Sequence, residues 1–530
     1  MNKNIQHHKY NTFSDFEQVV LPLNLGILIP EDDSVRLLSN ILDTVDIRRF
    51  VSKSLRVNRY THQSTRIMLK LLVYGYMNKA FSSRKIETLC KRDINFMWLL
   101  NGLKAPDHNT IARFRKKHSE EIEDILMQLV NSLASCKEID FDNVFIDGTK
   151  IEANANRYSF VWRGSTEKFQ IKLFTKIEKF VIDFNIKYCA NLEFEQSKAS
   201  LVLRTAKKAL EELLRFSNIN FVYGKGKHKS NLQKDYEMCN FLLEKQEKYN
   251  KYNATFNGRN SFSKTDVDST FMRMKEDHMK NGQLKPAYNF QVAVNSGYIV
   301  GTMTSQDRND ANTLKPFLNK LSRNLRSKFQ NIVADAGYES EEAYVFLVQN
   351  GYDSYIKPSN YEKRKTKAFK KQIGKRENMI YDKVSDEYTC HNSKQLVVTG
   401  QKIRKSKNQY NQIVTIYSCE NCSDCSLKGE CTKAKGNKVI ELSKKFAELR
   451  EKSFINITTK KGIQLRLNRS IQAEGVFAVI KEDYGFRKFL TRGIRNVQTE
   501  INLLAIAYNI VKLHLKIQNH KQETHLYAIE

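Results

Sequence analysis

Apolar and polar residues follow a helical period in the first part of the chain. From residue 34 to about 136, apolar side chains recur three or four positions apart, as Val35, Leu38 and Leu42 do. This spacing places them on one face of a helix. The pattern therefore predicts successive short helices over 34–136, preceded by an arm (1–33) that shows little periodicity.

Beyond these helices the period changes and strand-like stretches follow. An alternating run over 142–156 predicts a first strand. Two apolar runs within 287–305 predict a β-hairpin, because Asn295-Ser296-Gly297 between them suits a tight turn. We then expect, in order, a helix (about 311–327), a strand (330–338), a helix ending at Gly351 and a short strand (353–359).

Two long stretches interrupt this series. Residues 165–255 are helical and highly charged, and two long helices around the loop 221–231 predict a helical hairpin. Residues 361–378 are rich in Lys and Arg, as in a linker or an anion-binding arm, and a mixed β region follows to about 440. The pattern is helical again from 465 onward. This order predicts a mixed α/β sheet with two insertions.

The charge of the chain indicates its partner. The 530 residues include 88 Lys and Arg against 58 Asp and Glu, a formal net charge of +30. Such a charge favours a polyanion, with nucleic acid first and an anionic membrane surface second. A general bias toward Lys is the alternative. No apolar run approaches the ~18 residues of a transmembrane helix, and the N-terminus lacks the apolar core of a signal peptide. We expect a soluble intracellular protein.

Basic residues are concentrated in three tracks, at 113–117, 225–229 and 363–376. The first track lies on the second of two short predicted helices, for which Asp107 and Asn109 are candidate N-caps. Such a pair suits a helix-turn-helix that reads DNA, and a helical bundle with a solvated basic face fits equally well. The candidate DNA-binding residues are Arg113, Arg115, Lys116, Lys117, Lys363, Arg364 and Lys481.

Five of the nine cysteines lie between Cys390 and Cys431. Four of them have the spacing C-x2-C-x2-C-x5-C, which puts their thiols within reach of one tetrahedral ion. We predict a structural Zn²⁺ site, with an iron–sulfur cluster or four reduced cysteines as alternatives. The predicted ligands are Cys419, Cys422, Cys425 and Cys431.

Three acidic residues lie where a metal-dependent site can form. Asp147 ends the first strand before Gly148, Asp335 ends the fourth strand, and Glu474 lies on a late helix. Hard cations such as Mg²⁺ or Mn²⁺ need oxygen ligands from separated elements. Two such ions about 3.5–4 Å apart activate the attacking oxygen and stabilise the leaving one. Taken singly, each acid is more simply a turn residue or part of a solvated helix face.

Two basic residues share the late helix with Glu474. Lys481 follows it by seven residues, about two turns, so both side chains project from one face. Arg469 precedes it by five residues, on nearly the same side. Both could hold phosphates beside the ions.

Other acids of the same region have simpler interpretations. Asp310 is expected to cap a helix that begins near Ala311. Asp266 and Asp268 precede the second strand and are expected to be structural.

These motifs resemble those of DDE-class transposases of bacterial insertion sequences. That family carries an Asp on the first strand, an Asp at the end of the fourth and a Glu on a later helix of an RNase H-like core. The matching motifs are DGTK at Asp147, ADAGY at Asp335 and NRSIQAEGVFAVIK around Glu474. The N-terminal helical region and the Cys-rich insertion also resemble one subgroup of these transposases.

The late helix is similar to the Tyr-Arg-Glu-Lys signature of one large group of the family. Glu474 and Lys481 keep its Glu-to-Lys spacing. The chain departs from it elsewhere, because Leu467 stands in place of the Tyr and Ser470 in place of the Arg, with Arg469 one residue earlier.

The resemblance implies an α/β fold with an RNase H-like mixed sheet and helices. A helical insertion and a Cys-rich insertion would interrupt this sheet, and an all-α N-terminal domain would precede it. The expected segments are an arm (1–33), a helical DNA-binding domain (34–136), the first core strand (137–160), the helical insertion (161–286), the continued core (287–358), the basic and Cys-rich insertion (359–455), and the Glu helix with the C-terminal helices (456–530).

The resemblance also implies an activity. A transposase would bind the terminal inverted repeats of its element, cleave the phosphodiester with two Mg²⁺ or Mn²⁺ ions held by Asp147, Asp335 and Glu474, and join the 3′-OH ends to target DNA. We expect double-stranded DNA as partner, a homodimer in the DNA complex, no membrane partner, and a cytoplasmic, nucleoid-associated location. A metal nuclease that cuts without joining, and a non-catalytic DNA-binding protein from a decayed element, are the alternatives.

Overall fold

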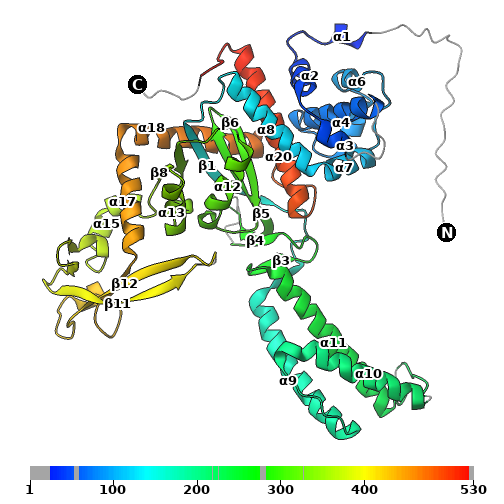
Figure 1. Ribbon diagram of the computed structural model, residues 1–530, viewed down its shortest axis with the longest axis vertical. Coiled ribbons are helices and arrows are strands. Elements are labelled where there is room, and N and C mark those ends of the chain that lie inside the picture. The colour runs from blue at the N-terminus through cyan, green and yellow to red at the C-terminus, as the bar shows by residue number, and fades with distance from the viewer. Residues whose placement is uncertain are drawn as a thin grey trace.

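The computed structural model describes residues 24–52, 59–217, 219–224, 226–274, 282–325, 327–406 and 408–524. Residues 1–23 of the predicted arm and Lys225 of the second basic track lie outside these ranges. Figure 1 shows a central sheet with helices, an N-terminal helical bundle beside it, and two projections, one of long helices and one built on a second sheet.

Short helices form the N-terminal part, as the spacing of apolar residues predicts. Helix α4 packs against several of them and against the C-terminal helix α20 (Ile494–Gln518). Asp107 caps α7 by accepting a hydrogen bond from the Asn109 backbone N–H at 2.8 Å, so the predicted cap at Asp107 is confirmed. The helices are α1 (Leu25–Leu28), α2 (Ser34–Thr44), α3 (Arg48–Ser52), α4 (Arg59–Met77), α5 (Ser83–Cys90), α6 (Ile94–Leu100), α7 (His108–Lys117) and α8 (Ser119–Ser135).

A mixed sheet forms the centre of the molecule. Its order is β4-β5-β1-β7-β8, and β6 pairs with β5. Strand β1 is antiparallel to β5 and parallel to β7, which is parallel to β8. The predicted mixed α/β sheet is confirmed. The strands are β1 (Asn143–Glu152), β4 (Thr270–Arg273), β5 (Leu284–Asn295), β6 (Tyr298–Ser305), β7 (Asn331–Ala334) and β8 (Asp353–Ile356).

The predicted hairpin turn joins β5 to β6. Ser296 and Gly297 both have positive φ, 53° and 78°, as a tight hairpin turn requires. Helices α12 (Leu314–Asn324) and α13 (Glu341–Gln349) connect β6, β7 and β8, and α20 packs on β6. Residues 503–507 of α20 are all fully buried, because this helix is enclosed between the sheet and the N-terminal bundle.

The first insertion contains three long helices, where the pattern predicts two. They are α9 (Arg163–Tyr188), α10 (Ala199–Ser217) and α11 (Asn231–Phe256), with a short 3-10 turn η1 (Gln196–Lys198) before α10. Helix α9 ends because Cys189 adopts a left-handed conformation, with φ at 50°. Strands β2 (Phe160–Trp162) and β3 (Ser261–Ser263) pair at the base of this insertion. The three helices, called the helical arm below, project away from the central sheet (Figure 1).

A second antiparallel sheet follows β8, in the order β13-β12-β11-β10-β9. The basic segment before it, predicted as a linker, contains short helices. These elements are α14 (Tyr361–Lys365), α15 (Lys367–Lys370), η4 (Arg376–Asn378), β9 (Ile380–Asp382), β10 (Glu387–Thr389), β11 (Gln395–Lys405), β12 (Asn411–Cys419), α16 (Lys428–Cys431) and β13 (Val439–Leu442).

The late helical region begins at Lys444, about twenty residues before the pattern predicts it. Its elements are α17 (Lys444–Thr458), α18 (Lys460–Arg469), the π-helical stretch η5 (Ser470–Glu474), α19 (Gly475–Ala478) and a second π-helical stretch η6 (Val479–Asp483). None of the helices that the structure describes combines the length and the apolar character needed to cross a membrane.

Candidate active site

Two of the predicted acids lie side by side, Asp147 within β1 and Asp335 directly after the parallel strand β7. In the pairing of β1 with β7, Ile146 is opposite Ala334, and Asp147 and Asp335 are the next residues along the chain. Paired strands lie about 4.8 Å apart, so these two acids are brought side by side. Asp147 is buried in the middle of β1, which continues to Glu152, so the prediction that it ends the first strand is wrong. Asp335 follows the end of β7 and caps the short 3-10 turn η3 (Ala336–Tyr338).

Arg469 links Asp147 to the third acid. Its guanidinium lies 3.5 Å from the Asp147 carboxylate and 2.9 Å from that of Glu474. The Asp147 side chain is 10% exposed and that of Glu474 is 55% exposed, so the cluster opens to solvent on the side of Glu474. The structure therefore brings Arg469, Asp147 and Glu474 together.

The π-helical stretch η5 explains how Arg469 reaches Glu474. Residues five apart are separated by about 140° around an α-helix, which repeats every 3.6 residues. A π-helix has i→i+5 hydrogen bonds, so residues five apart are stacked above one another. The backbone between Arg469 and Glu474 is π-helical, and this places the two side chains in contact.

Lys481 lies further along the same helical stretch, within the second π-helical part η6. It is buried, with 9% of its surface exposed. A solvated helix face, the simpler interpretation of this lysine, is therefore excluded.

Asp310 is a fourth acid that borders this cluster, although the sequence favoured a capping role for it. Its Oδ1 accepts hydrogen bonds from the side-chain amides of Asn289, at 2.7 Å, and Gln291, at 2.8 Å. It lies in the 3-10 turn η2 (Asp310–Asn312), and its side chain caps neither this turn nor α12. The predicted capping role of Asp310 is therefore wrong.

Two glycines leave room for this arrangement. A Cβ at Gly148 would lie 2.2 Å from Nε2 of Gln291 and 2.9 Å from Oδ1 of Asp310. A Cβ at Gly337 would lie 3.0 Å from Oδ1 of Asp335 and 3.4 Å from Oδ2 of Asp310, so both carboxylates border the same small space.

Tyr338 supports the side chain of Gln291, which contacts Asp310. The phenol is fully buried and donates a hydrogen bond to Oε1 of Gln291. Burial raises the pKa of Tyr338 well above its usual value, and the nearby carboxylates of Asp310, Asp147 and Asp335 raise it further. The Tyr338 hydroxyl thus holds the Gln291 amide, which in turn holds Asp310.

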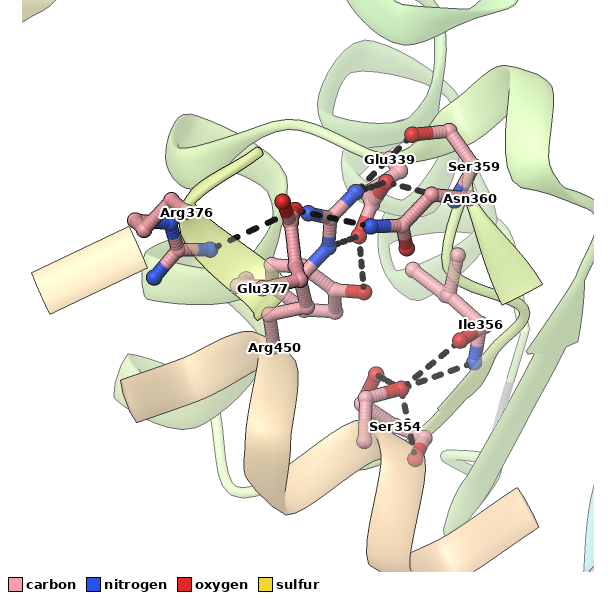
Figure 2. A network of polar contacts seen from close by, with 10 residues as sticks. Glu339, Ser354, Ile356, Ser359, Asn360, Arg376, Glu377 and Arg450 are labelled. Carbon is pink, nitrogen blue, oxygen red and sulfur yellow. Dashed lines mark hydrogen bonds and ion pairs between the residues drawn. The ribbon is translucent and has the colours of Figure 1, made fainter. Parts of the chain in front are cut away.

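The helices that carry Glu474 are fixed to the sheet by a polar network (Figure 2). Arg450 on α17 donates two hydrogen bonds of 2.5 Å to Glu339, just after η3, and one of 2.8 Å to the Ser359 hydroxyl. Ser453 accepts a hydrogen bond from the backbone N–H of Ile356 at the end of β8. These contacts hold α17 against β8 and against the segment that follows η3. Strand β8 pairs with β7, the strand that Asp335 follows.

The donor set fits divalent cations. Asp147, Asp335, Asp310 and Glu474 offer carboxylate oxygens, which are the ligands that Mg²⁺ and Mn²⁺ prefer. Their oxygens do not converge as closely as those of a group in the N-terminal bundle, because the Arg469 guanidinium lies between Asp147 and Glu474.

That N-terminal group consists of Glu87, Asp107 and His108, whose ligand atoms lie within 4.8 Å of one another, alone among the described residues. Hydrogen bonds within this group explain why its ligand atoms lie so close together. His108 Nδ1 lies 2.7 Å from Glu87, whose other oxygen accepts from Lys91 at 2.6 Å. Lys91 and His108 lower the pKa of Glu87 to about 2. The group ties α5 to α7.

The predicted zinc ligands gather at one end of the second sheet, together with Cys390. Burial raises the pKa of Cys431, and the thiols of Cys390, Cys422 and Cys425 contribute. The backbone N–H of Lys438 donates a hydrogen bond to the Cys422 sulfur at 3.4 Å. No three of these sulfurs, all within the described ranges, lie within 4.8 Å of one another.

Of the seven predicted DNA-binding residues, Arg115 and Lys481 are buried and the other five are exposed. Arg115 is buried and donates hydrogen bonds to the Tyr76 hydroxyl and the Phe81 carbonyl, so its predicted exposure is wrong. Helix α6 also lies between the two helices predicted to be consecutive. The side chains that face solvent as predicted are Arg113, Lys116, Lys117, Lys363 and Arg364.

Two parts of the chain match known protein families. Residues 23–117, which include α7, match a family described as a transposase domain (DUF772). Residues 389–514, which include Glu474 and the cysteines of the second sheet, match a family described as a transposase DDE domain. No curated protein and no solved structure matches the chain.

Proposed function

We propose that this chain, which belongs to the DDE-class transposases of the insertion-sequence type, cuts and joins DNA at the cluster of Asp147, Asp335 and Glu474. The observation that carries the proposal is the parallel pairing of β1 with β7, which sets Asp147 beside Asp335. The Arg469 bridge then brings Glu474 to the same place.

The sheet order supports an RNase H-like core. In chain order, β1, β5, β6, β7 and β8 form one sheet, antiparallel over the first three strands and parallel from β1 to β7 and β8. Asp147 then lies on the first of these strands and Asp335 at the end of the fourth, the positions that the resemblance implies.

Asp147, Asp335 and Glu474 would hold two Mg²⁺ or Mn²⁺ ions. Bound there, the ions would supply charge stabilisation for both the attacking and the leaving oxygen of a phosphodiester. Asp310 fits the role of a positioning residue, since Asn289 and Gln291 fix its carboxylate next to Asp335.

Arg469 and Lys481 would serve the phosphate. Arg469 neutralises two carboxylates in the structure, and its five donors can turn to phosphate oxygens when cations take over the carboxylates. Because Lys481 is buried on the same helical stretch, its charge would act in a weakly screened environment.

Recognition of the DNA ends would involve the N-terminal bundle. Arg113, Lys116 and Lys117 are exposed along α7, and this bundle matches a transposase domain of its own. Two inverted repeats would be held by two copies of the chain.

The test uses the wild-type protein and a duplex that carries the end of the element. With Mg²⁺ we expect cleavage that frees a 3′-OH, and with a pre-cut end we expect strand transfer into a second duplex. Cleavage without transfer would indicate a nuclease, and binding with neither reaction would indicate a non-catalytic DNA-binding protein. Either result would overturn the proposal.

A structural Zn²⁺ is proposed for the second sheet, with ligands among Cys419, Cys422, Cys425 and Cys431 and with Cys390 close by. Metal analysis of the purified chain should give zinc, and Cys431→Ser should lose it and lower the thermal stability of this sheet. Cys189→Ser, which changes an exposed cysteine of the helical arm, is the matched control. Iron with sulfide, or no metal, would refute zinc.

A further inference from the structure

Apart from the carboxylate cluster, the structure contains a basic cavity beside the helical stretch that carries Glu474. It has a volume of about 290 Å³ and lies between the β5–β6 turn, the π-helical stretch and the end of α20. This is roughly ten times the ~30 Å³ that one water occupies in the liquid. Glu474 itself does not line it, so the cavity is distinct from the carboxylate cluster.

The cavity is lined by three lysines, Lys512, Lys516 and Lys521, and the described residues of its wall include no acid. Lys512 and Lys516 are four residues apart on α20 and therefore share a face. Lys521 lies just beyond the end of α20. Its backbone N–H donates a hydrogen bond to the Lys516 carbonyl at 2.9 Å, which keeps it next to the helix. Three lysines thus border one small space.

One of these charges is neutralised. Lys516 lies 2.5 Å from Glu138. That carboxylate is fully engaged, because it also accepts hydrogen bonds from the Tyr298 hydroxyl at 3.0 Å and the Glu523 backbone at 2.9 Å. Glu138 therefore has little capacity left for the other two lysines.

Lys512 and Lys521 form no ion pair with any described residue. Lys512 is half-buried, and its Cε lies 3.1 Å from where a Cβ of Gly297 would be. Burial lowers the pKa of Lys512, and the charge of Lys521 lowers it further. A dianion in the cavity would relieve both effects, because opposite charge favours the protonated form.

We propose that this cavity binds a phosphate group of the DNA backbone through Lys512 and Lys521. The identity of the anion rests on the proposed function, whereas the anion site rests on the geometry alone. Ser296 and Tyr508, whose side chains carry hydroxyl groups, also line the cavity.

The site would act on the neighbouring carboxylate cluster. Gln472, in the π-helical stretch, accepts a hydrogen bond from the Gly297 backbone N–H at 2.9 Å and so joins the cavity wall to the helix of Glu474. A phosphate bound here would bridge α20 and the β5–β6 turn, and would thereby steady that helix against the sheet.

The first experiment is amine labelling of the full-length chain, read residue by residue by mass spectrometry. Inorganic phosphate and a DNA duplex are added separately, with sodium chloride matched for ionic strength. We expect both to protect Lys512 and Lys521, and chloride to leave them reactive. Protection by phosphate but not by the duplex would refute DNA as the source. No protection by either would refute the site.

The second experiment measures duplex binding against salt for the double variant Lys512→Gln/Lys521→Gln. Losing one phosphate contact should reduce the slope of log K against log salt by about 0.9. The charge-matched control is Lys172→Gln/Lys176→Gln, on the exposed face of α9. An equal change in both variants would refute a specific site. A wild-type protein that does not cleave DNA, but whose Lys512 and Lys521 are protected by phosphate, would count against the proposed function alone.

Discussion

Arg469 and Glu474 meet because the backbone between them is π-helical. On an ordinary α-helix a spacing of five residues would turn the two side chains away from each other. The extra residue of the π turn restores the contact that brings Glu474 to Asp147. The residue types of this segment do not indicate a π turn. The sequence therefore predicted a role for Arg469 only from its approximate position before Glu474.

Asp310 should matter to the reaction although it was expected to be a cap. We predict that Asp310→Asn lowers the rate of metal-dependent cleavage by about 10- to 100-fold, as loss of a group that orients metal ligands does. Thermal stability should change little, since Asn keeps the oxygen that accepts from Asn289 and Gln291. Asp307→Asn, in the same loop, is the control, and equal rates for the two variants would contradict a positioning role.

At the residue scale, the sequence predicted that Asp335 lies at the end of a strand, because it follows an apolar run and precedes Gly337 by two residues. The prediction that Asp147 ends a strand was wrong, because β1 continues past Gly148 to Glu152. Arg115 was misjudged because its partners, Tyr76 and Phe81, lie far away in the chain. Asp310 was misjudged for the same reason, since Asn289 and Gln291 reach it only after β5 forms.

At the scale of elements, the α17–α18 junction positions the helix of Glu474. Gly462 lies in its tightest part, where a Cβ would be 2.0 Å from the Asn456 carbonyl oxygen and 2.7 Å from the Ile457 Cα. Both neighbours are backbone atoms, so neither can rotate away. The junction therefore requires a residue without a side chain.

We predict that Gly462→Ala destabilises the protein by about 1–3 kcal/mol, the usual cost of overpacking. Gly475→Ala is the matched control, because it is helical and has nothing within 4 Å of the new Cβ. It should be neutral or stabilise by up to about 1 kcal/mol. Thermal unfolding measures both, and a Gly462→Ala variant that melts with the wild type would exclude this packing.

The contact between α5 and α7 should depend on pH. Lys91 and His108 hold the pKa of Glu87 at about 2, below its value of 4.5 in an unfolded chain. A lowered pKa gives stability that is complete above about 4.5 and is lost as the pH falls toward 2. Trp98 on α6, which lies between these helices in the chain, can report unfolding by fluorescence.

Glu87→Gln should therefore make the acid unfolding of this bundle shallower between pH 4.5 and 2. Glu178→Gln, on the arm, removes an acid that forms no ion pair with a described residue and should leave the profile unchanged. Parallel profiles for Glu87→Gln and wild type would show that the ionised Glu87 does not stabilise the bundle.

Elements with a clear period were predicted and short ones were not. The β5–β6 hairpin and the order of strands followed from alternation and turn residues. Helix α6 was missed because seven residues are too few to show a period, and burial of Phe96, Leu99 and Leu100 stabilises it. The break at Cys189 was missed because a left-handed cysteine has no sequence signal.

At the scale of the whole molecule, the chain builds one sheet from distant segments. The helical arm separates β1 from β5, and the second sheet separates β8 from the late helices, yet Asp147, Asp335 and Glu474 come together. Order along the chain allowed the sequence to predict this sheet. The basic cavity lined by Lys512 and Lys521 could not be predicted, because its wall combines a hairpin turn with two helical segments that are distant in the chain.

The most direct test of the central claim compares Asp147→Asn, Asp335→Asn and Glu474→Gln with the wild type on one end-bearing duplex, measuring binding and Mg²⁺-dependent cleavage in the same samples. Each substitution keeps the size of the side chain and removes its charge. We predict that all three variants bind the duplex like the wild type and do not cleave it. Full cleavage by any one of them would contradict its place in the catalytic cluster.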